Sequence, residues 1–244
     1  MTNDQIVALL ASIGACLSAV ATFLTVRQIA KQREASYRPE LALSRSIFEG
    51  STDPMVAGGR LPTFWFKKAQ PHESTKGVQR LTIPLQNVGL GTAKGVRLIW
   101  SFPIADVVTA VNQLAQRTLT PAYFVYEHGA VSIKSDTFGA RTSFWKNQEN
   151  DWIDYVLPAS VQNEAMNLTL PDAYVLLCSA LVFFGAKDKD AKSFPELPLL
   201  RARFEYRDMG EQEHQAGFDI ELHLIAFGGE GELIHGYLES RKVA

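Results

Sequence analysis

Residues 6–26 read IVALLASIGACLSAVATFLTV and contain no charged residue and no histidine. At about 1.5 Å per helical residue, a run of about 21 residues spans roughly 30 Å, the hydrocarbon thickness of a bilayer. The run is apolar on every side, whereas a helix packed on a soluble domain usually keeps one polar face. The stretch therefore predicts a single transmembrane helix near the N-terminus, followed by a soluble domain.

Two other interpretations of this run are a cleaved signal peptide and a buried helix of a soluble protein. A signal peptide has a basic n-region, a shorter apolar core and a cleavage site. The preceding residues 1–5 (MTNDQ) contain an acid and no base. Residues 19–21 (AVA) could imitate a cleavage site, but the apolar run continues to Val26. These features favour a membrane span over both alternatives.

The charges that flank the run predict its orientation. The basic residues that follow it are Arg27, Lys31, Arg33 and Arg38, with Glu34 as the single acid among them, whereas Asp4 is the only charged side chain before it. Basic flanks stay on the cytoplasmic side of a membrane. We therefore expect the N-terminus outside and residues 38–244 in the cytoplasm. The same basic residues can also contact anionic lipid headgroups.

One side of the predicted helix consists of small residues at spacings of three and four. They are Ala8, Ser12, Ala15, Ala19 and Thr22. Such spacing places residues on one face, and small residues let helices approach closely in lipid. The pattern predicts a packing seam for a homo-oligomer or for a membrane partner. The alternative is the ordinary abundance of small residues in membrane helices.

Alternating apolar and polar residues predict a mainly β, sandwich-like domain over residues 38–244, after an anchor and juxtamembrane helix over residues 1–37. The clearest hairpin pairs residues 200–207 with 218–224, because both arms alternate with period two. We expect loops over 50–59 and 67–77, which are rich in turn-forming residues. Further strands are expected over residues 40–44, 61–66, 78–86, 96–102, 123–127, 130–134 and 233–238.

Two helical segments are expected within this domain. Residues 104–117 place their apolar side chains on one face, which predicts an amphipathic helix. Residues 173–184 (AYVLLCSALVFF) follow Pro171 and Asp172, an order that suits a helix start. A buried strand is the alternative for this run, since a short continuous apolar stretch fits both structures.

Residues 85–96 read LQNVGLGTAKGV. This segment resembles the N-x-G-x-G-x-A pattern of β-sandwich domains in bacterial membrane-anchored proteins of unknown function. Their layout also has an N-terminal helix, an Arg-Pro stop like residues 38–39, and a late hairpin like residues 203–208. The resemblance implies a sandwich-like architecture in a bacterial inner-membrane protein, and it implies no activity.

The rest of the sequence carries no recognised catalytic or metal-binding pattern. Five histidines lack the spacing of metal ligands, and the net charge of −2 gives no footprint for nucleic acid. Cys16 in the span and Cys178 in the domain are not expected to pair, which fits a reducing compartment. We therefore expect no cofactor, no metal and no nucleic-acid partner.

Aromatic residues give the remaining indication of function. Trp65, Trp145 and Trp152 could belong to an exposed interaction surface, with packing in the core as the alternative. The favoured hypothesis is a membrane-tethered adaptor or sensor that binds a protein or a small ligand. The alternatives are a self-assembling membrane effector, for example in phage defence, and an enzyme whose site is not recognised.

Overall fold

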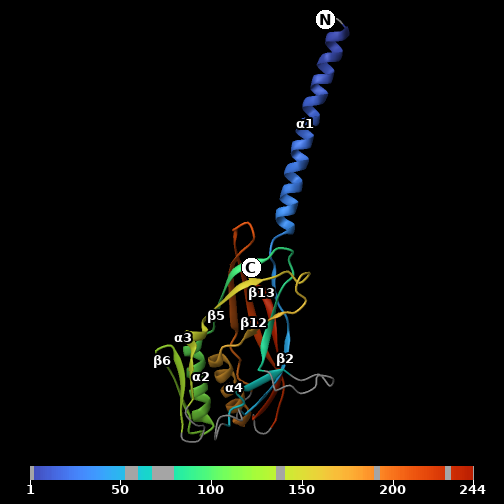
Figure 1. Cartoon of the computed structure of the whole chain (residues 1–244). Coiled ribbons are helices and arrows are strands. Elements are labelled where there is room, and N and C mark those ends of the chain that lie inside the picture. Colours follow the sequence, from blue (N-terminus) through green and yellow to red (C-terminus); the bar gives the residue numbers. More distant parts are fainter. Residues whose placement is uncertain are drawn as a thin grey trace.

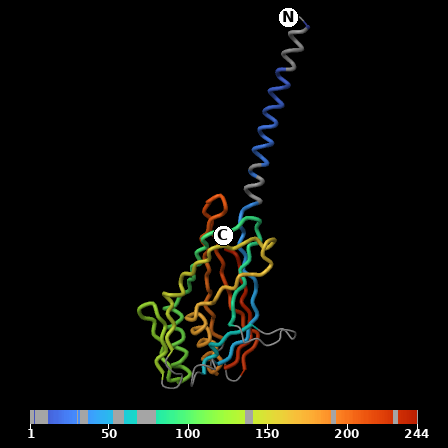
Figure 2. Tube along the Cα trace, viewed as in Figure 1, coloured from blue at the N-terminus to red at the C-terminus, as the bar shows by residue number. Residues whose placement is uncertain are grey.

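The computed structural model describes residues 3–52, 60–67, 80–135, 141–189, 193–228 and 232–243. Within the first helix, the side chains of residues 4–11, 30 and 32–36 are outside that description. This helix, α1 (Asn3–Ser36), projects from one end of a mainly β domain (Figure 1). The N-terminus is therefore far from the domain, whereas the C-terminus lies close to the base of α1 (Figure 2).

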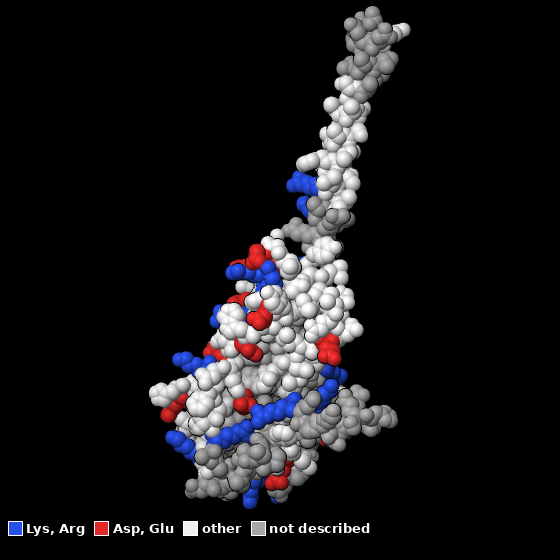
Figure 3. All heavy atoms as spheres, in the orientation of Figure 1, with Lys and Arg blue, Asp and Glu red and all other residues white. Residues whose placement is uncertain are grey.

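Among the described residues, one stretch is long and apolar enough to cross a membrane. It is Ser12–Ile29, and none of it is buried against the domain. In Figure 3 the described part of α1 carries Lys and Arg atoms only towards its domain end. Signal sequences share this length, composition and place in a chain, so the helix defines a candidate span.

The domain contains thirteen strands and three further helices within the described residues. The strands are β1 (Leu41–Leu43), β2 (Ser46–Ser51), β3 (Phe64–Lys67), β4 (Thr82–Asn87), β5 (Ala93–Ser101), β6 (Tyr123–Glu127), β7 (Ala130–Lys134), β8 (Arg141–Phe144), β9 (Asn150–Val156), β10 (Met166–Thr169), β11 (Leu200–Arg207), β12 (Glu213–Gly228) and β13 (Leu233–Val243). The helices are α2 (Ile104–Arg117), α3 (Trp145–Gln148) and α4 (Asp172–Lys187).

The strands form three sheets, and neighbouring strands in each sheet are antiparallel. The largest sheet has seven strands in the order β3-β2-β13-β12-β11-β5-β9. A three-stranded sheet has the order β1-β4-β10, and a second one has the order β6-β7-β8. In β11 every second side chain, from Leu200 to Tyr206, is buried, which is the alternation expected of a sheet with one solvated face.

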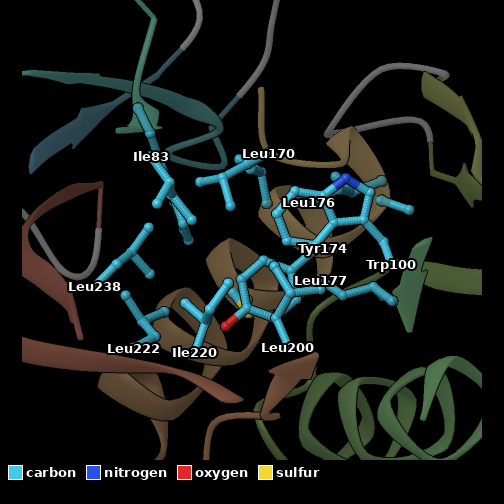
Figure 4. Packing of buried hydrophobic residues seen from close by; sticks show 14 of the residues in the cluster. Ile83, Trp100, Leu170, Tyr174, Leu176, Leu177, Leu200, Ile220, Leu222 and Leu238 are labelled. Carbon is cyan, nitrogen blue, oxygen red and sulfur yellow. The ribbon is translucent and has the colours of Figure 1, made fainter. Parts of the chain in front are cut away.

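One hydrophobic core connects the sheets with α4. Figure 4 shows Ile83 of β4 on one side of this core and Ile220, Leu222 and Leu238 of the large sheet on the other, with Tyr174 of α4 near them. Helix α2 packs on α4 and on β6 at the end of the domain opposite α1 (Figure 1). The domain thus has one end next to α1 and an opposite, distal end.

Residues 173–184, for which both a helix and a buried strand were considered, form a helix. Every residue of α4 from Ala173 to Phe184 is buried, so its apolar side chains face neighbours on all sides. Its first turn is held by Gln148, whose side-chain oxygen accepts the N–H of Asp172 at 2.8 Å. The same amide donates to the Asp172 carboxylate at 3.0 Å.

Several predicted boundaries differ from the structure. The loops expected over 50–59 and 67–77 begin inside β2 and β3, and their residues 53–59 and 68–77 lie outside the described residues. The strand expected over 78–86 begins at Thr82. Strands β2, β8, β9 and β10 were not predicted. Strands β8 and β10 contain only four residues each, and the seven residues of β9 lack a regular alternation of buried and exposed positions.

Candidate functional site

At the end of the domain next to α1, the polar side chain of Asn87 is 1% exposed and makes four hydrogen bonds. Its Oδ1 accepts the backbone N–H of Glu40 at 2.9 Å and that of Gly89 at 3.1 Å. Its Nδ2 donates to the carbonyl oxygens of Gly91 at 2.6 Å and Val156 at 3.1 Å. An amide offers two acceptor positions and two donors, so this side chain is fully bonded.

These four bonds join three separate parts of the chain. Glu40 belongs to the linker, residues 37–40, that leaves α1. Gly89 and Gly91 belong to the turn after β4, and Val156 is the last residue of β9. The backbone extends the connection, because Val88 N–H donates to the Glu40 carbonyl oxygen at 2.8 Å. We call this arrangement the linker clamp: Asn87 with the backbone groups of residues 40, 88, 89, 91 and 156.

The two glycines of the motif allow the linker to lie directly on the turn. A Cβ atom on Gly89 would lie 2.3 Å from the carbonyl oxygen of Arg38. A Cβ atom on Gly91 would lie 1.7 Å from the carbonyl oxygen of Tyr37. Both distances are far below van der Waals contact, so only glycine fits there. The N-x-G-x-G segment is therefore a docking surface for the linker.

A second connection reaches the linker from the hairpin between β11 and β12. The hydroxyl of Tyr206 donates to the carbonyl oxygen of Pro39 at 3.4 Å. The ring of Tyr206 stacks on that of His214 with centroids 5.6 Å apart, and burial raises the pKa of Tyr206. His214 Nε2 lies 2.9 Å from Oδ2 of Asp208. Contacts thus run from the hairpin tip to the linker.

Asp208 organises the hairpin tip. Its Oδ1 accepts the backbone N–H groups of Gly210 at 2.8 Å and Gln212 at 3.0 Å. The hydrogen bond with His214, followed by these backbone bonds, lowers the pKa of the Asp208 carboxyl. The carboxylate form is therefore favoured in the folded chain.

The outer face of the large sheet is covered by paired charges. Arg201 lies 3.2 Å from Asp219 on the neighbouring strand, and Arg207 lies 3.4 Å from Glu213. On the face seen in Figure 3, basic and acidic atoms of the domain intermix. This mixture suits a solvated sheet face.

Two grooves lie beside the hairpin of β11 and β12. One has a volume of about 450 Å³ and is lined by the linker, by Val88 and Leu90 of the turn, and by Lys242. The other has a volume of about 480 Å³ and is lined by Arg97, Trp152 and Arg207. Tyr206 and Gln215 border both grooves. The end of the domain next to α1 is therefore recessed on both sides of this hairpin.

The three tryptophans predicted for an exposed surface have different positions. Trp65 is 3% exposed, and its Nε1 donates to the Pro62 carbonyl oxygen at 2.9 Å. Trp145 is 6% exposed and packs edge-on against Phe102. Both belong to the core, so the expected surface does not include them. Trp152 is 68% exposed, and its ring faces the Arg97 guanidinium at 5.7 Å.

The predicted seam residues Ser12, Ala15, Ala19 and Thr22 are exposed on α1, and the side chain of Ala8 lies outside the described residues. The Thr22 hydroxyl donates to the carbonyl oxygen of Ser18 at 2.9 Å, so it is bonded within its own helix. Of the predicted topology residues, Arg27, Lys31 and Arg38 are exposed, whereas the side chain of Arg33 lies outside the described part of the chain.

Histidines of the described residues lie beside carboxylates at two places, His214 beside Asp208 and His223 at 3.4 Å from Glu221 and 3.6 Å from Glu239. No set of three or more His, Cys, Asp or Glu side chains there could hold a metal ion. Cys178 is fully buried in α4, and burial raises the pKa of its thiol well above the usual range. A thiol in that state is a weak nucleophile. The distinctive chemistry of this domain is therefore hydrogen bonding at the linker and an exposed aromatic edge.

Comparisons with protein-family models, with curated proteins and with solved structures find no match to this chain. The resemblance of residues 85–96 to bacterial membrane-anchored sandwich proteins therefore stays a prediction. The sequence drew attention to the N-x-G-x-G segment without indicating its role. That role depends on the linker, whose residue Glu40 lies 47 residues before Asn87.

Proposed function

We propose that this chain is a single-pass membrane protein whose β domain is a binding module, acting as an adaptor or a sensor beside the membrane. The observation that carries the proposal is the linker clamp. A domain that only has to stay near a membrane can be attached through a flexible linker. Here the linker is bonded into the domain through a buried amide with four hydrogen bonds.

The clamp provides a physical route between a binding event and the anchor. Asn87 contacts the end of β9 through Val156 and the linker through Glu40. A ligand that favours one position of β9 therefore favours one position of the linker. Coupling of this kind is reciprocal, so a change in the packing of the anchor would also alter the affinity of the domain for its ligand.

We further propose a cytoplasmic location for the domain at a bacterial inner membrane. The support is the basic cluster Arg27, Lys31, Arg33 and Arg38 on the domain side of the apolar run. Two free cysteines, Cys16 and Cys178, agree with a reducing compartment. We regard the domain as sandwich-like, because the β1-β4-β10 sheet and the seven-stranded sheet contribute to one core.

A second candidate function is a membrane effector whose anchors assemble. It is favoured by the freedom of α1, since none of Ser12–Ile29 is buried against the domain. The Thr22 and Thr25 hydroxyls are bonded to carbonyl oxygens of their own helix, which leaves a smooth face of small residues. In this function the clamp would orient the domains around the assembled anchors.

The mass of the intact chain, extracted from its native host in a mild detergent, separates the two candidates. An adaptor or sensor gives a monomer or a defined complex with another protein. An effector gives a homo-oligomer that dissociates when Ala15→Leu and Ala19→Leu fill the small-residue face. The control is Ile13→Leu with Val20→Leu, which changes side-chain shape on the opposite face with little added bulk and leaves the assembly intact.

The clamp itself is tested by a spin label on Tyr37→Cys, in the full chain with Cys16→Ser. We expect restricted motion of the label, and greater mobility when Asn87→Ala removes the clamp. The control Asn167→Ala makes the same chemical change at an exposed position and leaves the label restricted. A label that is already mobile with Asn87 present would contradict the proposal.

A further inference from the structure

Strand β9 is an open edge of the large sheet. It is the last strand in the order, and within the described residues it pairs only with β5. In Figure 1 it is the yellow strand that follows α3 and lies beside β5. The other edge strand, β3, makes a bridge to Arg80 through its own residue Phe66. An open edge offers a row of unpaired backbone groups to another strand.

The register shows which backbone groups of β9 are free. Trp100 N–H donates to the Glu149 carbonyl oxygen at 2.8 Å, and Leu98 is opposite Asp151. In an antiparallel ladder, bonded and non-bonded pairs alternate. The N–H and C=O groups of Asp151 and Ile153 therefore face β5, whereas those of Asn150, Trp152 and Asp154 face outward.

One of these outward donors is already satisfied. The N–H of Trp152 donates to the side-chain Oδ1 of Asp151 at 2.8 Å. No bond to the N–H of Asn150 or of Asp154 occurs in the described part of the chain. Asn150 and Asp154 lie four positions apart, so an added antiparallel strand, which bonds every second residue of the edge, can bond both of them. The edge can therefore accept a further strand.

The side chains of β9 indicate the chemistry of that strand. Trp152 is 68% exposed and Tyr155 is 58% exposed, so each face of the edge presents an aromatic surface. Residues 147–157 contain three acids, Glu149, Asp151 and Asp154, and no base. Two bases of the neighbouring strand β5 lie opposite β9, and both are engaged: Arg97 donates to Asn150 Oδ1 at 3.0 Å and lies 3.6 Å from Glu205, and Lys94 pairs with Glu211. The edge is thus aromatic and acidic.

We propose that the open edge of β9 binds an extended, basic segment of a partner protein, which adds to the large sheet as a further strand. Opposite charges on facing strands attract, and like charges destabilise the pairing. A second copy of β9 would bring a second set of acids, and no base, to the same edge, so the charges favour a basic partner over self-pairing. Addition of a strand through backbone bonds is a common mode of peptide recognition.

This inference rests on the proposed function and specifies its binding site. The C-terminal end of β9 is Val156, whose carbonyl oxygen accepts a hydrogen bond from Asn87. A strand added to β9 therefore lies next to the linker clamp. Binding at this edge has a direct physical path to the anchor.

The test uses the full chain in a non-ionic detergent and two short synthetic peptides. In one peptide Lys alternates with Thr and Val, and in the other Glu replaces Lys. We expect the Lys peptide alone to slow hydrogen exchange at the amides of Asn150 and Asp154. The amides of Asp151 and Ile153, which already bond β5, provide the internal control. Unchanged exchange at Asn150 and Asp154 at saturating peptide would overturn the proposal.

Two variants test the charge of the edge and its free N–H groups separately. Asp151→Lys with Asp154→Lys reverses the charge of the edge, and we expect the Lys peptide to bind about tenfold more weakly while the Glu peptide gains affinity. Asp154→Pro removes one outward N–H and should abolish protection at Asn150 by the Lys peptide. Asp154→Ala is its control for the loss of the side chain. Equal binding of both peptides by the parent chain and the charge-reversed chain would also overturn the proposal.

Failure of this inference is distinguishable from failure of the proposed function. A defined complex with another protein in detergent, together with a restricted label at position 37, would support the binding module even if β9 binds neither peptide. In that case the partner occupies another surface. Protection at β9 combined with a mobile linker would instead locate a binding site without the clamp.

Discussion

Among single residues, Asn87 is the one whose side chain makes four hydrogen bonds to backbone groups of the described chain, and its loss would leave those groups without this partner. Asn87→Ala would leave the N–H of Glu40 and the carbonyl oxygens of Gly91 and Val156 without that partner. We expect the free energy of unfolding to fall by about 2–4 kcal/mol, measured by urea unfolding of the full chain. Asn167→Ala, at an exposed position, should cost under about 0.5 kcal/mol. Equal effects of the two substitutions would show that the clamp adds no stability.

A second prediction at the residue scale concerns the acid limb of stability. The ordinary pKa of Asp208 is 3.8, and hydrogen bonds from His214 and the backbone lower it in the folded chain. Its contribution is therefore complete above about pH 5 and is lost as the pH falls through the lowered pKa. Between about pH 5 and pH 3, stability should fall less steeply for Asp208→Asn than for the parent chain. Parallel curves would contradict this assignment.

At the scale of elements, α4 is the helix that the core encloses completely. Its Cys178 thiol is fully buried, and burial raises its pKa, so both access and reactivity are low. In a Cys16→Ser chain, we expect a water-soluble maleimide to leave Cys178 unmodified under native conditions and to modify it completely in urea. Modification at the same rate in both conditions would show that α4 is not enclosed.

The helices and strands also differ in how accurately their bounds could be predicted from the sequence. Helix α2 has the predicted bounds, Ile104–Arg117, because its apolar residues recur with the helical period. Strands β6 and β7 also match, since His128 and Gly129 form the turn between them with positive φ. The sequence of α4 has no such period, because every side is buried. The helical conformation of α4 therefore depends on packing against the surrounding elements.

At the scale of the whole molecule, the tryptophans report the assembly of the core. Trp65, Trp100 and Trp145 are buried, whereas Trp152 is 68% exposed. Aqueous iodide should therefore quench one component of the fluorescence of the native chain. Trp152→Phe should remove that component and leave the remaining emission resistant to quenching. Quenching that persists in Trp152→Phe would place a second tryptophan at the surface.

The sequence by itself determined that the chain carries one candidate membrane span and a mainly β domain, because apolar length and period-two alternation are local properties. It also identified the N-x-G-x-G segment, whose role was not visible there. The tertiary structure alone decided that Trp65 is buried while Trp152 is exposed, and that Asn87 holds the linker. Glu40 and Asn87 are 47 residues apart, so their contact exists only once the sheets have brought the two segments together.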